Sequence, residues 1–136
     1  MEDLFTILKN MNIPSVLCHI DLVCDNCLVL KNGEIRLIDW EYSGMCDPMV
    51  DIAFLAIYSN LSEEQLEELL GYYFADSNPT NFDRMRVFIY ASLGGFLWYL
   101  WALYKQSLGL NTGDYAKRMF RYAQEYPAKV NDLLNK

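Results

Sequence analysis

The chain has 136 residues, 53% of them hydrophobic and 15% aromatic, which excludes a disordered segment and fits a single folded domain. Its formal net charge of −7 disfavours nucleic-acid binding, because affinity for a phosphate backbone comes from Lys and Arg side chains. A small cationic ligand fits this charge better.

The beginning of the chain, residues 1–10, lacks the cationic flank and apolar centre of a secretory signal. We therefore expect a cytoplasmic protein whose four cysteines are free thiols. Cys24 and Cys27 form a CxxC close to His19, and a zinc site is the alternative interpretation. A second pair at zinc-ligand spacing is missing, so we favour free thiols.

The first segments of the chain alternate between regular and irregular structure. Residues 3–11 have the pattern of a helix that ends before Pro14. A short apolar segment, 16–18, then leads into a polar loop over residues 19–26. This loop contains most of the side chains from which the function can be inferred.

A β-hairpin is predicted directly after this loop. Two β-type runs, 27–30 and 35–38, flank Asn32-Gly33, and Asn-Gly between apolar runs favours a tight turn with both residues at positive φ. The hairpin has Asn26 at its entry and Asp39 at its exit.

The rest of the chain is predicted to be helical. Asp47 followed by proline is typical of a helix start, and this helix continues to residue 58. Ser62 and Gln65 have the spacing of a capping box that opens a helix to residue 74. Further helices are predicted at 81–108 and 112–125, with Pro127 beginning a last short one.

The segment from Val87 to Tyr104 carries no charge and approaches the length of a membrane span. It contains Gly94, Gly95 and several Trp and Tyr residues, whose polar tips suit the centre of a helical domain better than lipid. We therefore predict a core helix and no membrane span.

Four polar residues around the hairpin form the main functional pattern. His19, Asp21 and Asn26 have the spacing HxDxxxxN, and Asp39 follows the hairpin after an apolar run. Phosphoryl transfer from ATP needs a carboxylate to orient the attacking hydroxyl and oxygen ligands to hold Mg²⁺ against the phosphates. Asp and Asn supply ligands of this kind.

This pattern resembles the catalytic loop of protein kinases, with Asp39 in the place of their magnesium-binding aspartate. The sequence Asp-Trp-Glu at this place is similar to the aminoglycoside phosphotransferase and choline kinase superfamily, which has a protein-kinase-like fold. The resemblance implies an α+β, mostly helical C-terminal lobe with a small catalytic-loop hairpin. It also implies that Asp21 is the catalytic base, that Asn26 and Asp39 bind Mg²⁺, and that His19 organises the loop.

The following residues indicate the acceptor substrate. Residues 38–43, IDWEYS, are similar to the choline kinase signature, in which Glu41 is the discriminating residue and serves either Mg²⁺ or the substrate cation. The segment GxxDPxxDIA that follows is also similar to this superfamily. In it, Asp47 and Asp51 have structural roles, Asp47 as a helix cap and Asp51 as a possible tie to the catalytic loop. Residues 57–59 lack the acidic residue that some eukaryotic choline kinases have there, so the resemblance is closer to bacterial choline kinases.

A quaternary ammonium is recognised by aromatic faces and carboxylates, because it cannot donate hydrogen bonds. Trp98 and Trp101 lie three residues apart on one helix face and resemble the paired cage tryptophans of choline kinases. Tyr104 and Tyr58 are further candidates. Aromatic residues at this spacing are also typical of a plain helical core.

Only 18 residues precede His19, too few for the N-terminal lobe that holds the ATP phosphates in such kinases. We therefore expect residues 1–136 to form a single domain, the C-terminal lobe, with weak or no kinase activity by itself. Apolar surface left bare by the absent lobe predicts self-association into a homodimer.

Two alternatives to choline phosphorylation remain. One is another small-molecule kinase of the same superfamily, acting on ethanolamine, an aminoglycoside or a different alcohol. A polybasic antibiotic calls for many carboxylates, and the region from residue 71 on has few: Asp76, Asp83, Asp114, Glu125 and Asp132. The other alternative is a non-catalytic kinase-like interaction domain.

Overall fold

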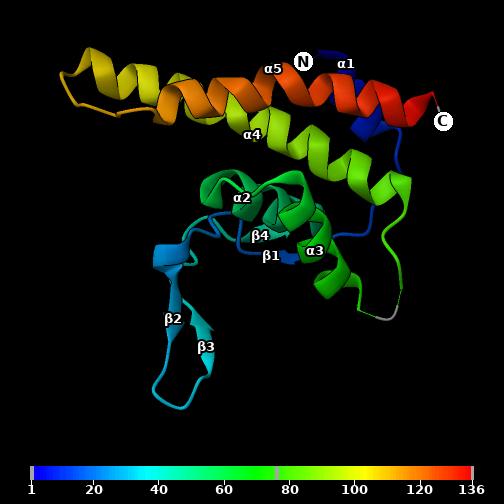
Figure 1. Ribbon diagram of the computed structural model, residues 1–136, viewed down its shortest axis with the longest axis horizontal. Helices are drawn as coiled ribbons and strands as arrows, with labels where there is room; N and C mark the ends of the chain where they lie inside the picture. The colour runs from blue at the N-terminus through cyan, green and yellow to red at the C-terminus, as the bar shows by residue number, and fades with distance from the viewer. Residues whose placement is uncertain (1, 76, 136) are drawn as a thin grey trace. The chain divides into compact units, whose positions relative to one another are not determined.

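The computed structural model describes residues 2–75 and 77–135, which form two compact units (Figure 1). We call Asn12–Pro79 the hairpin unit, and residues 1–11 together with 80–136 the helical unit. The predicted fold class, mostly helical with a small hairpin, is confirmed. The expectation of a single domain stays a prediction.

The hairpin unit contains two antiparallel strand pairs. β2 (Cys27–Val29) pairs with β3 (Ile35–Leu37) as predicted, and β1 (Val16–Cys18) pairs with β4 (Gly44–Cys46). The sequence did not predict β4, because a three-residue strand that begins with glycine has no recognisable alternation of apolar and polar residues. This second pairing brings the segment before the catalytic loop next to the segment after the hairpin.

The turn of the hairpin differs from the prediction. Only Gly33 has a positive φ, 84°, and Asn32 does not. The Leu30 N–H bonds to the Glu34 carbonyl oxygen at 2.8 Å, so the loop holds three residues with glycine in the left-handed position. Such a loop needs only one residue at positive φ, and the Asn32 side chain instead accepts the Glu34 N–H at 3.0 Å.

Two helices complete the hairpin unit. α2 (Met49–Ser59) has Pro48 at its N-cap position, one residue later than predicted. The Asp47 Oδ1 still accepts the N–H of the first helical residue, Met49, at 2.9 Å. The helix ends at Asn60, which adopts the left-handed conformation with φ 52°. α3 (Glu63–Phe74) opens with the predicted capping box, in which the Ser62 and Gln65 side chains each accept the other's backbone N–H.

The helical unit consists of three helices, α1 (Glu2–Lys9), α4 (Asn81–Ser107) and α5 (Tyr115–Leu134). α4 and α5 run side by side and in opposite directions, with α1 beside them (Figure 1). Residues from all three helices share one hydrophobic core, with Leu4 of α1, Met85 and Ile89 of α4, and Val130 of α5 at its centre. The core therefore joins the two ends of the chain.

α5 continues through Pro127, so the predicted break at this residue is wrong. A proline removes the hydrogen bond to the carbonyl four residues earlier and normally bends or ends a helix. Here Tyr122 and Tyr126 before the proline and Val130 after it are all buried. Packing of these side chains on both sides of Pro127 keeps the helix continuous. Sequence rules for isolated helices do not include such tertiary packing.

α4 is the one helix in the described ranges that is long and apolar enough to cross a membrane. Of its most apolar window, 44% is buried. Gly94 and Gly95 are buried, and α5 packs so closely that a Cβ on Gly95 would lie 2.7 Å from the Met119 carbonyl oxygen. A helix packed against neighbours in this way is the core helix of its unit.

Candidate active site

His19 is buried at the start of the predicted catalytic loop. Only 1% of its surface is exposed, and its Nε2 lies 2.8 Å from the Ile38 carbonyl oxygen. A carbonyl can only accept, so Nε2 carries a proton and donates it. The imidazole also contacts the Trp40 ring, with the ring centres 4.7 Å apart. His19 thus connects the start of the loop to the segment on which Asp39 and Glu41 lie.

Asn26 is hydrogen-bonded to Asp21. The Asn26 side-chain nitrogen donates to the Asp21 carbonyl oxygen at 2.9 Å and lies 3.3 Å from the Asp21 carboxylate. Asn26 is buried, at 8% exposure, at the end of a short 3₁₀ helix, η1 (Cys24–Asn26). Because its amide nitrogen is used in this way, the amide oxygen is left for another partner such as a cation.

Asp39 follows directly on a backbone contact with Asn26. The Ile38 N–H donates to the Asn26 carbonyl oxygen at 3.0 Å, which extends the β2–β3 pairing to the two ends of the hairpin. Asp39 itself is exposed, has φ 61°, and makes no hydrogen bond or ion pair with the described residues. The structure therefore brings His19, Asp21, Asn26 and the backbone before Asp39 into one hydrogen-bonded network.

Asp51 binds the loop from the first turn of α2. Its Oδ2 accepts the His19 N–H at 2.9 Å and its Oδ1 accepts the Ile20 N–H at 2.7 Å. Ile20 has φ 70°, which a β-branched residue rarely adopts. Two hydrogen bonds to one carboxylate compensate for this strain and hold the backbone between His19 and Asp21.

Two positive-φ residues, Ile20 and Asp39, therefore lie within the proposed site. A strained residue of this kind costs about 1–3 kcal/mol and persists where the surroundings fix it, often at functional positions. Sequence reasoning missed both, because neither Ile nor Asp at these positions predicts a left-handed backbone. The other predicted residue of this segment, Glu41, is exposed in the turn in which the Ser43 N–H bonds to the Trp40 carbonyl oxygen.

The aromatic residues predicted to bind the substrate belong partly to the helical unit. Trp98 and Trp101 are in edge-to-face contact with ring centres 5.9 Å apart, and Trp101 also meets Tyr115 of α5 at 6.1 Å. Tyr104 is exposed and does not line the pocket described below. Tyr58 belongs to the hairpin unit, where its ring meets Phe54 at 5.8 Å.

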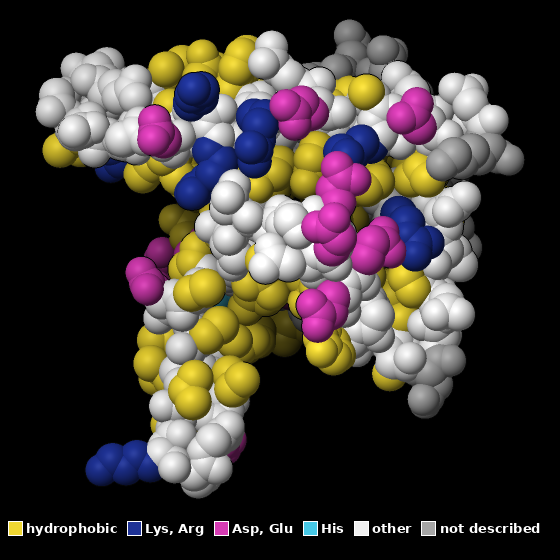
Figure 2. All heavy atoms as spheres, viewed as in Figure 1, with side chains coloured by type: hydrophobic (Ala, Val, Ile, Leu, Met, Phe, Trp, Pro, Cys, Tyr) yellow, Lys and Arg dark blue, Asp and Glu magenta, His cyan; other side chains and the backbone are white. Residues whose placement is uncertain are grey.

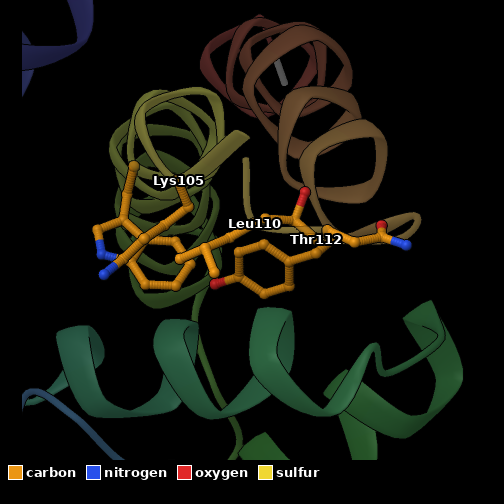
Figure 3. Close-up of a pocket in the computed structure, with 6 residues that line it drawn as sticks. Lys105, Leu110 and Thr112 are labelled. Carbon is orange, nitrogen blue, oxygen red and sulfur yellow. The ribbon is translucent and has the colours of Figure 1, made fainter. Parts of the chain in front are cut away.

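A pocket of about 420 Å³ lies where α4 passes into α5 (Figure 3). Trp101 and Tyr115 supply aromatic walls, and Lys105, Leu110 and Thr112 complete the lining together with Asn111. The Lys105 ammonium lies 5.2 Å from the centre of the Trp101 ring. Sequence reasoning did not identify Tyr115 or Lys105, because only the pairing of α4 with α5 brings Tyr115 to the tryptophans.

Metal-binding side chains are sparse. Within residues 2–75 and 77–135, no three His, Cys, Asp or Glu side chains gather in a metal-binding arrangement. The four cysteines are free thiols. Asn26 with its free amide oxygen and Asp39 with its unpaired carboxylate are the oxygen ligands that fit a hard cation such as Mg²⁺.

Comparison with known proteins agrees with the geometry of this loop. The phosphotransferase enzyme family (APH) matches residues 4–88. The chain belongs to this family. The matched range includes the HxDxxxxN loop, the hairpin and α2. Every residue of the hydrogen-bonded network around Asn26 therefore lies within it.

The proteins that this chain resembles include one described as a choline kinase. Protein LicA of Haemophilus influenzae is 40% identical over 119 residues, which cover 81% of this chain and 44% of that protein. The crystal structure of choline kinase LicA from Streptococcus pneumoniae matches with 34% identity and a TM-score of 0.75, covering 93% of this chain and 45% of that one. A LicA structure in complex with AMP matches with a TM-score of 0.77 and 34% identity, covering 93% and 44%. The chain thus spans less than half the length of these relatives.

Proposed function

We propose that the chain is the catalytic and acceptor-binding part of an ATP-dependent kinase that converts choline to phosphocholine. The observation that carries this proposal is the contact between Asn26 and Asp21, with Ile38 bonded to the Asn26 backbone. One loop and one hairpin thereby hold a carboxylate for the acceptor hydroxyl and two oxygen ligands for Mg²⁺, which is what phosphoryl transfer requires.

In this proposal Asp21 accepts the proton of the acceptor hydroxyl and orients its oxygen for attack. Asn26 and Asp39 hold Mg²⁺, which neutralises charge on the ATP phosphates when bound. His19 and Asp51 position the loop and touch no substrate. Glu41 serves the metal or the substrate cation, and its exposed carboxylate fits both roles.

Trp98 and Trp101 recognise the choline ammonium in this proposal. Their edge-to-face contact fixes both rings, and an aromatic face attracts a quaternary ammonium by about 0.5–2 kcal/mol. Tyr115 is added to the predicted set because its ring meets Trp101. Tyr104 and Tyr58 stay secondary candidates.

Nucleotide binding needs a second lobe. The relatives are more than twice as long as the matched segment, and the hairpin carries exposed apolar residues, Val29 at 73% and Ile35 at 65% (Figure 2). Apolar surface of this kind is normally covered by another part of a protein. We propose that a nucleotide-binding N-terminal lobe covers this apolar surface in the whole enzyme, which is cytoplasmic. The chain alone is then inactive and forms homodimers through the same surface.

The test compares the chain alone with a fusion to the preceding lobe of the Haemophilus influenzae relative. Each protein receives ATP, Mg²⁺ and either choline, ethanolamine or kanamycin, and the phosphorylated acceptor is quantified by mass spectrometry. We expect turnover only by the fusion, with choline preferred over ethanolamine and no reaction of kanamycin. Turnover of the antibiotic alone would contradict the choline assignment.

A variant of the fusion protein at Asp21 distinguishes an effect on the phosphoryl-transfer step from an effect on choline binding. Asp21→Asn in the fusion should lower kcat by at least about 100-fold with little change in the KM for choline, because it removes the proton acceptor and keeps the shape. A folded fusion that neither binds choline in calorimetry nor phosphorylates any acceptor would overturn the kinase proposal as a whole.

A further inference from the structure

The CxxC formed by Cys24 and Cys27 has no part in the proposed phosphoryl transfer, although it encloses Asn26. Cys24 opens η1 and is exposed, and Cys27 is half-buried at the first position of β2. Both thiols are free. The two cysteines therefore flank the residue whose amide binds Asp21, and at least one of them is open to reagents in solution.

The backbone already brings the two cysteines close. The Cys27 N–H bonds to the Cys24 carbonyl oxygen, which closes a single 3₁₀ turn. In such a turn the side chains three residues apart eclipse each other. The Cα atoms of a closed four-residue turn lie within about 7 Å, and disulfides bridge Cα separations of about 4.4–6.8 Å. The backbone thus needs little movement for a disulfide.

Each thiol has only a weak partner. The Cys24 sulfur lies 3.6 Å from the Ser59 hydroxyl oxygen, and the Cys27 sulfur lies 3.7 Å from the Val23 carbonyl oxygen. Contacts of thiol groups at these distances are weak hydrogen bonds. Rotation of both side chains toward each other therefore costs little.

The other two cysteines, Cys18 and Cys46, differ from this pair in the pKa of their thiols. Cys18 is 1% exposed, and its sulfur lies 3.5 Å from the Asp47 carbonyl oxygen and 3.6 Å from that of Cys46. Burial raises the pKa of the Cys18 thiol to about 12, and burial also raises the pKa of Cys46. A thiol with a raised pKa is less often in the reactive thiolate form, so Cys18 and Cys46 are internal controls that should react more slowly.

We propose that Cys24 and Cys27 form a reversible dithiol–disulfide site that low-molecular-weight disulfides oxidise and low-molecular-weight thiols reduce. The exposed Cys24 sulfur attacks the reagent disulfide, forms a mixed disulfide and releases one reduced thiol. The Cys27 sulfur then attacks the Cys24 sulfur of this mixed disulfide and releases the second low-molecular-weight thiol. In total, two protein thiols and one disulfide give one protein disulfide and two thiols, which balances hydrogen and electrons.

The site places a covalent ring around Asp25 and Asn26. In the oxidised form the Cys24 sulfur loses its contact with the Ser59 hydroxyl, and the Cys27 sulfur loses its contact with the Val23 carbonyl oxygen. Disulfide formation is measured by peptide mass and requires no kinase activity, so its test does not depend on the proposed kinase reaction.

The test treats the chain with oxidised glutathione, blocks remaining thiols with iodoacetamide, and digests with trypsin. Cleavage after Lys9 and Lys31 places Cys18, Cys24 and Cys27 on one peptide, while Cys46 lies on the peptide 37–84. We expect peptide 10–31 to lose two hydrogen atoms and to carry one alkyl group on Cys18, with the alkylated Cys46 peptide unchanged. Dithiothreitol should restore the reduced mass.

Two variants test the order of the steps. Cys27→Ser should stop at a stable glutathione adduct on Cys24, and Cys24→Ser should react at least about tenfold more slowly, because the exposed sulfur is missing. A wild-type chain that retains glutathione on Cys24 without ring closure would overturn the proposal. So would a preferred link from peptide 10–31 to peptide 37–84 or to a second chain.

Discussion

The Ser92 hydroxyl donates a hydrogen bond to the Ala123 carbonyl oxygen at 3.4 Å. Ala123 lies four residues before Pro127, so its carbonyl is the one that loses a helical N–H donor to the proline ring. A side chain of α4 thus supplies the hydrogen bond that α5 cannot make for itself. This contact explains, with the packing of Tyr126 and Val130, why α5 continues through a proline.

Replacing Ser92 with Ala should therefore destabilise the protein by about 1 kcal/mol, near the lower limit for a lost buried hydrogen bond because the contact is long. Urea unfolding followed by circular dichroism measures this. In a Pro127→Ala background the loss should be smaller, since an alanine in place of the proline restores the N–H donor within α5. Equal losses in both backgrounds would show that the Ser92 contact does not compensate for the proline.

Gly95 is needed for the close approach of α4 and α5. A Cβ at this position would lie 2.7 Å from the Met119 carbonyl oxygen and 2.9 Å from the Tyr122 Cβ. Gly95→Ala should cost about 1–3 kcal/mol of stability, because the two helices must separate. Gly71→Ala is the matched control in α3, where no atom lies within 4 Å of the new Cβ. It should stabilise the chain by about 0.5–1 kcal/mol through helix propensity. Similar changes in the free energy of unfolding for Gly95→Ala and Gly71→Ala would contradict the close packing of α4 against α5.

The Asp51 carboxylate holds two successive N–H groups, and Asn has only one acceptor oxygen. Asp51→Asn should lower stability by about 1.5–3 kcal/mol and speed hydrogen exchange at the amides of His19 and Ile20. Asp132→Asn, on the exposed face of α5, is the control and should change neither. Unchanged protection of the two amides in Asp51→Asn would show that another group fixes this backbone.

Asp83 should make stability depend on pH in the acid range. Its burial alone would raise its pKa, but hydrogen bonds from Thr80 and the ion pair with Arg86 outweigh burial and hold the pKa below the usual 3.8. A carboxyl with a lowered folded-state pKa contributes stability above 3.8, and this contribution disappears as pH falls through the folded value. Asp83→Asn should therefore be less stable than wild type near neutrality, with the difference shrinking below pH 3.8. A constant difference in urea unfolding at all pH values would refute the assignment.

Lys105 should compete with a ligand cation for Trp101. Its ammonium lies 5.2 Å from the ring centre, where a choline ammonium would also bind under the proposed function. A cation–π contact at an exposed site contributes about 0.5–1 kcal/mol, so Lys105→Met should bind choline about two- to fivefold more tightly. Calorimetry measures this, with the exposed Lys117→Met as control. Weaker choline binding by Lys105→Met would mean that Lys105 supports the ligand.

Local rules predicted most elements of this fold. The hairpin, the capping box of Ser62 and Gln65, and the long helix α4 all depend on neighbours within a few residues, and sequence shows these directly. The HxDxxxxN loop was also recognisable, because the spacing from His19 to Asn26 and the position of Asp39 after a hairpin form a specific pattern. The phosphotransferase family was predicted on these residues and is confirmed.

Features that depend on contacts between distant segments were not predictable. β4 exists because it pairs with β1, and α5 passes Pro127 because α4 packs beside it. The positive φ of Ile20 is maintained by the Asp51 carboxylate, 31 residues further along the chain. Tyr115 reaches Trp101 only through the pairing of two helices. In each case the residue that makes the contact lies far away in the sequence, and rules based on neighbouring residues do not include it.

The shared core of α1, α4 and α5 also sets the order in which this protein can fold on the ribosome. Leu4 leaves the exit tunnel before Val130, its partner in the same core, is translated. An eight-residue helix is not stable by itself in water. The α1 residues therefore have no core partner in α5 until α5 has been translated, and a nascent chain arrested before α5 would expose Leu4 and its apolar neighbours to chaperones.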